Sequence, residues 1–227
     1  MQGYPLIDLS HELDTSTQVY PGDPKFSSCP AATLEQDGFN VLRISLGSHT
    51  GTHVDAPYHS IKGGACIPAL DLSLFQGPAL VIDVRGKQAR EKITWQDLRA
   101  HESQMRKGVI VLLHTGWSAY WKSSKYIDHP FLDRTAVEGL VKTGVRTVGI
   151  DTLSPDETMH EGMVSQGGFF AHEHILGVEG GGVIVENLTN LDAITFEDPI
   201  VSLLPLKLTG GDGSPVRAVA WPGQRIP

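Results

Sequence analysis

Hydrophobic residues along the chain are grouped in short runs that predict more strand than helix. Each run is rich in Val, Ile or Leu and is bounded by Gly, Pro, Asp or Asn, as strands are. The expected strands cover residues 5–9, 40–47, 79–84, 109–113, 145–151, 182–187, 200–208 and 216–220. Strands from one end of the chain to the other, with helical crossovers only in the middle, favour a mixed sheet.

Two segments carry helical signals. Thr94 is a typical N-cap residue, and Asp97 stands in the first turn of the helix that would follow it. Across residues 134–142 the apolar side chains fall on one stripe, and Gly144 can end that helix before the next strand. No repeat, linker or low-complexity segment divides the chain. We therefore expect a single α/β domain with a mixed sheet over residues 1–227.

Composition excludes several kinds of partner. The chain has 18 Lys and Arg against 26 Asp and Glu, a formal net charge of −8, and no basic run. A nucleic-acid partner or an anionic membrane is therefore disfavoured. The longest apolar runs are strand-sized and the N-terminus lacks a basic start, so no membrane span or secretory signal is expected. Cys29 and Cys66 lie outside any Cys-x-x-Cys pattern. They favour reduced thiols and a cytoplasmic protein, and one disulfide between them stays open.

Ten histidines are many for a chain of this length, and several of them cluster in one short segment. Residues 48–59 read Ser-His-Thr-Gly-Thr-His-Val-Asp-Ala-Pro-Tyr-His. Just upstream, apolar and polar residues alternate over 40–47, which predicts a half-buried strand. If that extended backbone continues, His49, Gly51, His53 and Asp55 share one face because side chains alternate along a strand.

This cluster predicts a metal site. Imidazole and carboxylate ligands together suit Zn²⁺ or Mn²⁺, and Gly51 leaves room for an ion near the backbone. His59 follows Pro57, so it is expected on a turn beside the ion, where a base belongs. A helical His-x-x-x-His site of the metalloprotease kind is disfavoured because Gly51 and Pro57 make a poor helix. A polar turn without an ion stays open.

The pattern H-x-G-T-H-x-D-x-P-x-H, from His49 to His59, resembles the cyclase family of metal-dependent amidohydrolases. This family includes bacterial-type kynurenine formamidase and isatin hydrolase. Supporting segments occur in matching order at residues 8–11, 20–23, 149–155, 171–172, 184–188, 204–207 and 213–218. The resemblance spans nearly the whole chain, and it implies a swivelling β/β/α-like fold with a mixed sheet.

The resemblance also implies a ligand set. It makes His49, His53 and Asp55 metal ligands, His59 the catalytic acid/base, and Glu186 a carboxylate ligand from a late strand. One more histidine is implied in the segment Ala-His-Glu-His-Ile-Leu-Gly, residues 171–177.

That segment offers both His172 and His174. We favour His172, because loops absorb the two extra residues that this alignment needs more easily than ligand-bearing segments do. Asp151 and Asp156 are interpreted as turn-forming groups or outer partners of the ligands, not as ligands.

The resemblance further implies hydrolysis of a C–N amide bond in an aryl formamide or a cyclic amide. A bound ion supplies hydroxide near neutral pH, and a histidine can move the protons. No G-x-S-x-G elbow, P-loop or G-x-G-x-x-G fingerprint occurs, which disfavours a serine hydrolase, an NTPase or a dinucleotide enzyme. Two alternatives stay open: a polyketide-type cyclase/dehydratase, and a non-catalytic metal-stabilised protein that binds a small ligand.

Several finer features rest on the resemblance. Two carboxylates give the site a charge of −2, which is compatible with one ion or two. Tyr20 stands where the formamidases have a Trp that lines the substrate pocket, so the aromatic substrate, amide or lactam, need not be a kynurenine. The resemblance further implies a homodimer or a larger homo-oligomer.

Overall fold

The computed structural model describes residues 6–160 and 168–223, and within them one mixed sheet of nine strands organises the fold. Its order is β1 (Ile7–Asp8), β13 (Val219–Pro222), β11 (Pro199–Ser202), β5 (Gln76–Asp83), β7 (Ile110–His114), β9 (Thr147–Ile150), β10 (Val183–Glu186), β4 (His53–Asp55) and β12 (Gly213–Pro215). The central strands β5, β7, β9 and β10 are parallel, and the outer strands pair antiparallel. The expected α/β fold with a mixed sheet is confirmed.

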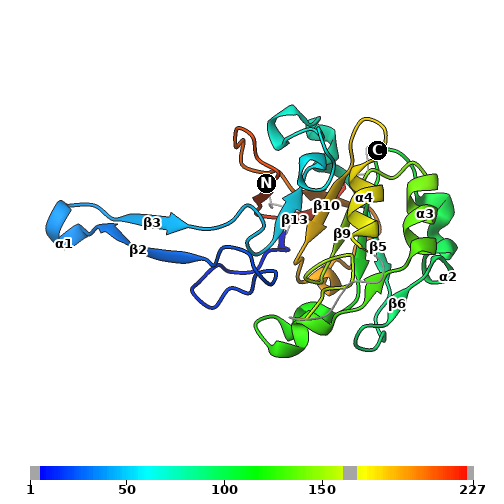
Figure 1. Ribbon diagram of the computed structural model, residues 1–227, viewed down its shortest axis with the longest axis horizontal. Helices are drawn as coiled ribbons and strands as arrows, with labels where there is room; N and C mark the ends of the chain where they lie inside the picture. The colour runs from blue at the N-terminus through cyan, green and yellow to red at the C-terminus, as the bar shows by residue number, and fades with distance from the viewer. Residues whose placement is uncertain (1–5, 161–167, 224–227) are drawn as a thin grey trace.

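The sheet separates two hydrophobic cores. Along β7, Val111 and Leu113 pack on one face while Ile110 and Leu112 pack on the other. The first core is covered by α2 (Trp95–Leu98), α3 (Arg134–Lys142) and α4 (Phe170–Leu176), all of which contribute side chains to it (Figure 1). Because successive strand residues point to opposite faces, a strand buried on both sides is hydrophobic throughout.

The predicted helix over 134–142 is confirmed with both of its ends as α3. The Asp133 carboxylate accepts from the backbone N–H of Ala136 at 2.9 Å, which caps the first turn. Gly144, with φ of 83°, follows the helix as expected. The helix start with Thr94 as N-cap and Asp97 in the first turn is also confirmed, but α2 ends at Leu98 and continues as a 3-10 helix over Arg99–Gln104. Helix α4 was not predicted.

Most predicted strands occur with shifted ends. The expected strand over 200–208 is shorter, since β11 stops at Ser202, and residue 5 lies outside the described part of the chain. Strand β12 was not predicted. A short parallel pair, β6 (Lys92–Ile93) with β8 (Phe131–Leu132), lies apart from the main sheet.

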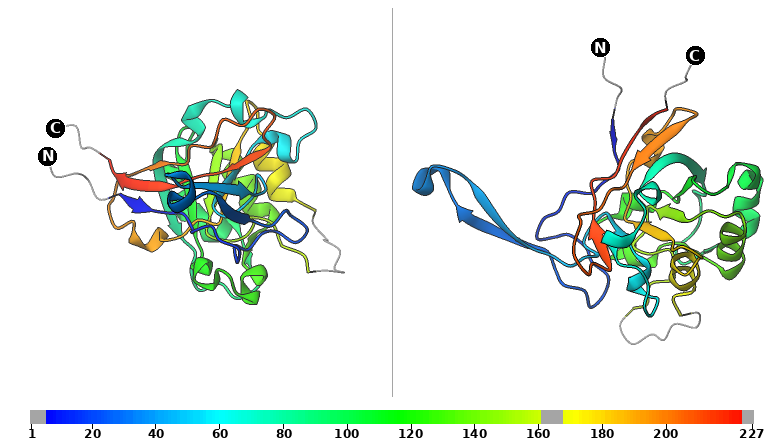
Figure 2. Two further views of the ribbon diagram at one scale, coloured as in Figure 1. Left: turned by 90° about the vertical axis from the view of Figure 1, so that its left-hand side faces the viewer. Right: turned by 90° about the horizontal axis from the view of Figure 1, so that it is seen from above.

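An arm projects from the body of the molecule. It consists of β2 (Ser27–Ala32), α1 (Leu34–Asp37) and β3 (Val41–Ser45), and β2 pairs with β3 as a hairpin (Figure 2). Every residue of β3 is exposed, so the expectation of a half-buried strand was wrong for this chain on its own. The alternation of apolar residues is present, but nothing in the described part of the chain covers it.

The structure also bears on membrane-spanning segments and on the two cysteines. Among the described residues, no helix is both long and apolar enough to cross a membrane. Cys29 and Cys66 are free cysteines, so the disulfide that the sequence left open is not formed.

Candidate metal centre

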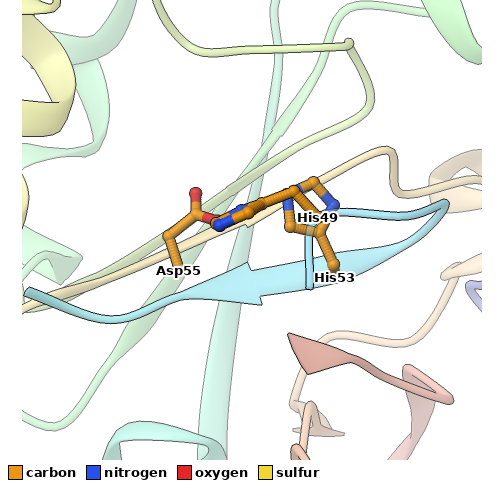
Figure 3. Close-up of side chains that lie close together, drawn as sticks. All are labelled: His49, His53 and Asp55. Atoms are coloured by element: carbon orange, nitrogen blue, oxygen red, sulfur yellow. The ribbon is translucent and has the colours of Figure 1, made fainter. Parts of the chain in front are cut away.

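Strand β4 and the turn before it bring the histidine cluster together. Residues 48–52 form a turn in which Gly51 has a φ of 65°, and a Cβ there would lie 2.3 Å from Leu13 Cδ2. The extended backbone expected from 49 to 55 was therefore wrong. His53 and Asp55 still share one face of β4, because they are two residues apart, and His49 reaches the same place from the turn (Figure 3).

Strand pairing explains why Glu186, far away in the sequence, joins this cluster. The antiparallel register of β10 with β4 places Glu186 directly opposite His53. Side chains of directly opposed residues lie on the same face of a sheet and within contact distance. His172 reaches the cluster from the buried face of α4, where it is 5% exposed.

Short distances join the five groups. Asp55 Oδ1 is 2.6 Å from His49 Nδ1 and 3.3 Å from His53 Nε2. Asp55 Oδ2 is 3.6 Å from His172 Nε2. The Glu186 carboxylate lies 3.3 Å from each of two imidazoles, through Oε2 to His53 and through Oε1 to His172. Two donor groups result, and Asp55 belongs to both: His49, His53 and Asp55 form one, and Asp55, His172 and Glu186 form the other.

The outer nitrogens of these imidazoles are engaged elsewhere. Nδ1 of His53 donates to the Gly51 carbonyl at 2.8 Å, and Nδ1 of His172 donates to Asp156 Oδ2 at 2.7 Å. Asp156 also accepts the backbone N–H groups of Ala171 and His172 at the start of α4. Histidines that ligate metals are commonly held in this way, with one nitrogen fixed by an outer partner and the other turned to the ion.

A test of fit for a metal comes from the inner atoms of the cluster. His53 Nε2, Asp55 Oδ2 and Glu186 Oε1 are buried and have no hydrogen-bond partner among the described residues. Leaving buried polar atoms unsatisfied costs about 1–3 kcal/mol each. A divalent cation bound among these three atoms would satisfy all of them, so the donor set fits a metal.

The electrostatics of the cluster also call for positive charge. Burial alone would lower the pKa of His53, but Asp55 and Glu186 raise it to about 10. Burial opposes ionisation of Asp55 too, yet the neighbouring imidazoles hold its pKa well below the usual value. The two carboxylates therefore stabilise the protonated form of the imidazoles. A metal ion would displace those protons, because its ligands must be deprotonated.

His59 lies beside the cluster at the end of a 3-10 turn over Pro57–His59. Its ring centroid is 4.1 Å from that of His49 and 5.5 Å from that of His172. Burial lowers the pKa of His59, which favours the neutral imidazole at neutral pH. A neutral imidazole can accept a proton, so this position suits an acid/base.

A pocket opens onto the cluster and contains His59. Its volume is about 580 Å³, and its walls include Tyr20 and Phe169, whose ring centroids are 6.4 Å apart at an angle of 57°. His49, His172 and Glu186 also line this pocket. The rings of Tyr20 and Phe169 offer a flat aromatic molecule an apolar surface to pack against within the pocket that opens onto the cluster.

The two candidate histidines of α4 occupy different surroundings. His172 faces the cluster, whereas His174 is exposed, donates from Nδ1 to the Phe170 carbonyl at 2.9 Å and stacks on the Phe170 ring. Residues two apart on a helix point about 200° apart, so only one of them can face the sheet.

The sequence reasoning missed Asp212. Its Oδ2 atom lies 3.1 Å from His49 Nε2 and 3.7 Å from His59 Nδ1. The available signal was an acidic residue enclosed by glycines at 210, 211 and 213, just before a strand.

Comparison with known proteins supports the fold and the chemistry. Residues 7–157 match the family described as "Putative cyclase". A kynurenine formamidase of Bacillus cytotoxicus is 35% identical over 219 residues, covering 95% of this chain and 97% of that protein. Isatin hydrolase A from Labrenzia aggregata bound to benzyl benzoate superposes with a TM-score of 0.83 at 24% identity, covering 97% of this chain and 94% of the other. A potential metal-dependent hydrolase with cyclase activity superposes with a TM-score of 0.77 at 26% identity, covering 98% and 100%.

Proposed function

This chain belongs to the cyclase family, and from that membership we propose that it is a metal-dependent amidohydrolase acting on an aryl formamide or a cyclic amide. Its relatives include kynurenine formamidases and isatin hydrolases. The observation that carries the proposal is the group of unsatisfied buried atoms on His53, Asp55 and Glu186, because they converge beside a pocket that also holds His59.

The proposed ligands are His49, His53, Asp55, His172 and Glu186, and the proposed metal is Zn²⁺ or Mn²⁺. A set of imidazoles and carboxylates suits either ion. Because Asp55 is shared by the two donor groups, the same five residues can hold one ion or two. The charge of −2 on Asp55 and Glu186 neutralises one divalent ion.

The chemistry requires water, a metal and a proton carrier. When bound, a divalent ion lowers the pKa of water to near 7 and polarises a carbonyl group. The His59 imidazole takes a proton as the water oxygen bonds to the carbonyl carbon. His59 then returns that proton to the nitrogen as the C–N bond breaks, which gives a carboxylic acid and an amine.

A substrate panel tests the proposal. Protein loaded with Zn²⁺ or Mn²⁺ is expected to hydrolyse formanilides or isatin-type lactams, measured by the appearance of amine or carboxylate product. Stoichiometric metal together with no turnover of any amide, lactam or ester would contradict the hydrolase and would favour a metal-stabilised binding protein. Dehydration of a linear precursor without hydrolysis would instead indicate a cyclase/dehydratase.

Tyr20 is proposed to bind the aromatic part of the substrate. Replacing Tyr20 with Ala is expected to raise KM about 2- to 12-fold for an aromatic amide, since an aromatic pair contributes roughly 0.5–1.5 kcal/mol beyond buried area. Tyr20→Phe keeps the ring and serves as the control. An equal change in KM for an aliphatic formamide would show that Tyr20 does not recognise the ring.

We also propose that the protein is a homodimer or larger and that the arm packs against a second copy. The arm exposes Leu34, Phe39, Val41, Leu42 and Ile44, each more than two-fifths exposed. A two-stranded hairpin is marginally stable alone in water, and large apolar side chains gathered on an exposed surface mark an interface. A second chain packed on the arm would bury these side chains.

The double variant Leu42→Asp, Ile44→Asp tests the arm. Burying two such side chains contributes about 1.5–3 kcal/mol each. The dissociation constant of the oligomer should therefore rise at least about 100-fold relative to the unaltered protein. Sedimentation over a range of concentrations measures this change. Leu72→Asp is the matched control, because Leu72 is 66% exposed on the body of the molecule. An unaltered protein that is monomeric throughout would contradict the proposal.

For the compartment, we propose the cytoplasm. The free thiols of Cys29 and Cys66 fit a reducing environment.

A further inference from the structure

The carboxylate of Asp212 lies on the outer side of His49. Its Oδ2 atom is 3.1 Å from Nε2 of His49, while Nδ1 of the same ring is 2.6 Å from Asp55 Oδ1. The His49 imidazole is thus held between two carboxylates, one at each nitrogen. A carboxylate accepts hydrogen bonds and donates none, so Nε2 donates to Asp212 and Nδ1 donates to Asp55 when both carboxylates are ionised. A metal ion at Nδ1 would displace only the proton on Nδ1, and Nε2 would keep its bond to Asp212.

We propose that Asp212 is a positioning residue that fixes the tautomer and the orientation of His49, and leaves Nδ1 of that ring for the metal. This inference rests on the proposed function, because it assigns Asp212 a role toward the proposed metal ligands. Asp212 itself does not touch the metal in this arrangement, and it acts through His49.

Backbone pairing holds Asp212 in this place. Strand β12 pairs with β4 with Gly213 opposite Asp55, and the carbonyl of Asp212 accepts from the backbone N–H of Ala56 at 2.8 Å. A Cβ at Gly213 would lie 2.7 Å from Cε1 of His49, so the missing side chain lets the ring lie against β12. The position of the Asp212 carboxylate therefore follows from the strand pairing that builds the cluster.

The other two imidazoles of the cluster show the same arrangement. His53 donates its outer N–H to the Gly51 carbonyl, and His172 donates its outer N–H to Asp156. With Asp212 on His49, each of the three imidazoles has one nitrogen held by an oxygen and the other turned inward. Such outer partners orient ligands and raise their basicity, and losing one typically costs 10- to 100-fold in metal affinity.

A second role for Asp212, through His59, is less favoured by the distances. The 3.7 Å from Asp212 Oδ2 to His59 Nδ1 is too long for a hydrogen bond, whereas the contact with His49 is within range. Asp212, His49 and His59 also lie close enough to ligate an ion themselves. In that arrangement the ion would lie between His49 Nε2 and Asp212. Nδ1 of the same ring would then stay bonded to Asp55 and would not face an ion.

The experiment measures metal affinity by competition with a chelator for the full chain and for Asp212→Ala and Asp212→Asn. Asp212→Ala is expected to raise the Kd for Zn²⁺ or Mn²⁺ about 10- to 100-fold. Asp212→Asn is expected to have a smaller effect, because its amide oxygen still accepts from His49. Asp192→Ala, which removes an exposed carboxylate outside the cluster, should leave Kd unchanged. At saturating metal, kcat of both Asp212 variants should approach that of the unaltered protein.

Three results would overturn the inference. An unchanged Kd in Asp212→Ala would show that His49 needs no outer carboxylate. Fewer bound ions, with the remaining ions held as tightly as before, would make Asp212 a ligand. A lower kcat at saturating metal with unchanged Kd would place its role on His59. Failure of the unaltered protein to bind metal would instead remove the proposed function itself, so the two failures are distinguishable.

Discussion

Replacing Asp55 with alanine is expected to abolish metal binding and, with it, hydrolysis. Asp55 is fully buried and lies between the imidazoles of His49, His53 and His172. It is also the residue that the two donor groups share. Loss of Asp55 should therefore lower metal affinity by more than the roughly 10- to 100-fold that follows loss of an outer partner. Elemental analysis of purified protein and chelator competition measure the effect.

Asp55→Asn accompanies this variant because it keeps the shape of the side chain while removing the charge. If Asp55→Ala fails to fold, the asparagine variant still reports on the charge, and its affinity should also fall. Asp192→Ala is the control for the loss of one surface carboxylate. Full metal content in both Asp55 variants would contradict the proposed centre.

Replacing His59 with alanine is expected to keep the metal but lower kcat about 10²- to 10⁴-fold, as loss of a general acid/base does. His59 faces the pocket and stands next to His49 and His172, and burial lowers its pKa so that a neutral imidazole is favoured. Steady-state kinetics on the best amide from the panel, with metal content measured on the same sample, test this expectation.

His174→Ala is the matched control for His59, because His174 is an exposed imidazole on the α4 face that points away from the cluster. It should change neither metal content nor kcat. Loss of metal in His59→Ala would make His59 a ligand. An unchanged kcat would show that other groups or water move the protons.

Much of the fold follows from local patterns in the sequence. The helix over 134–142 is found as predicted because its apolar stripe and the glycine after it agree. Strand β7 is nearly as predicted, since a short apolar run buried on both faces has few alternatives. Helix α4 was missed because its seven residues bury a histidine among the apolar positions, which hides the helical stripe.

The arm illustrates what a sequence pattern cannot distinguish. Leu42 and Ile44 alternate with polar residues as they would in a half-buried strand, but the strand lies outside the body of the molecule. The alternation reports that a face is suited to burial, and it does not report which chain buries it. Among the described residues this face is uncovered, and a second copy as its partner stays a prediction.

The convergence of His49, His53 and Asp55 was predicted for a reason that is only half right. The alternation holds for His53 and Asp55, but a turn, not a continued strand, brings His49 to them. Asp212 could not be placed beside His49 from sequence, because 163 residues separate the two and only the pairing of β12 with β4 joins them. Whether these groups bind a metal stays a prediction.

Anomalous diffraction from crystals of the protein loaded with Zn²⁺ or Mn²⁺ tests the central proposal most directly. The proposed centre predicts a strong peak within coordination distance of His53 Nε2, an Asp55 oxygen and a Glu186 oxygen. A second peak beside His172 would indicate two ions. A map with no peak among these residues, or with the metal bound only elsewhere on the protein, would contradict the proposed metal centre and the hydrolytic function built on it.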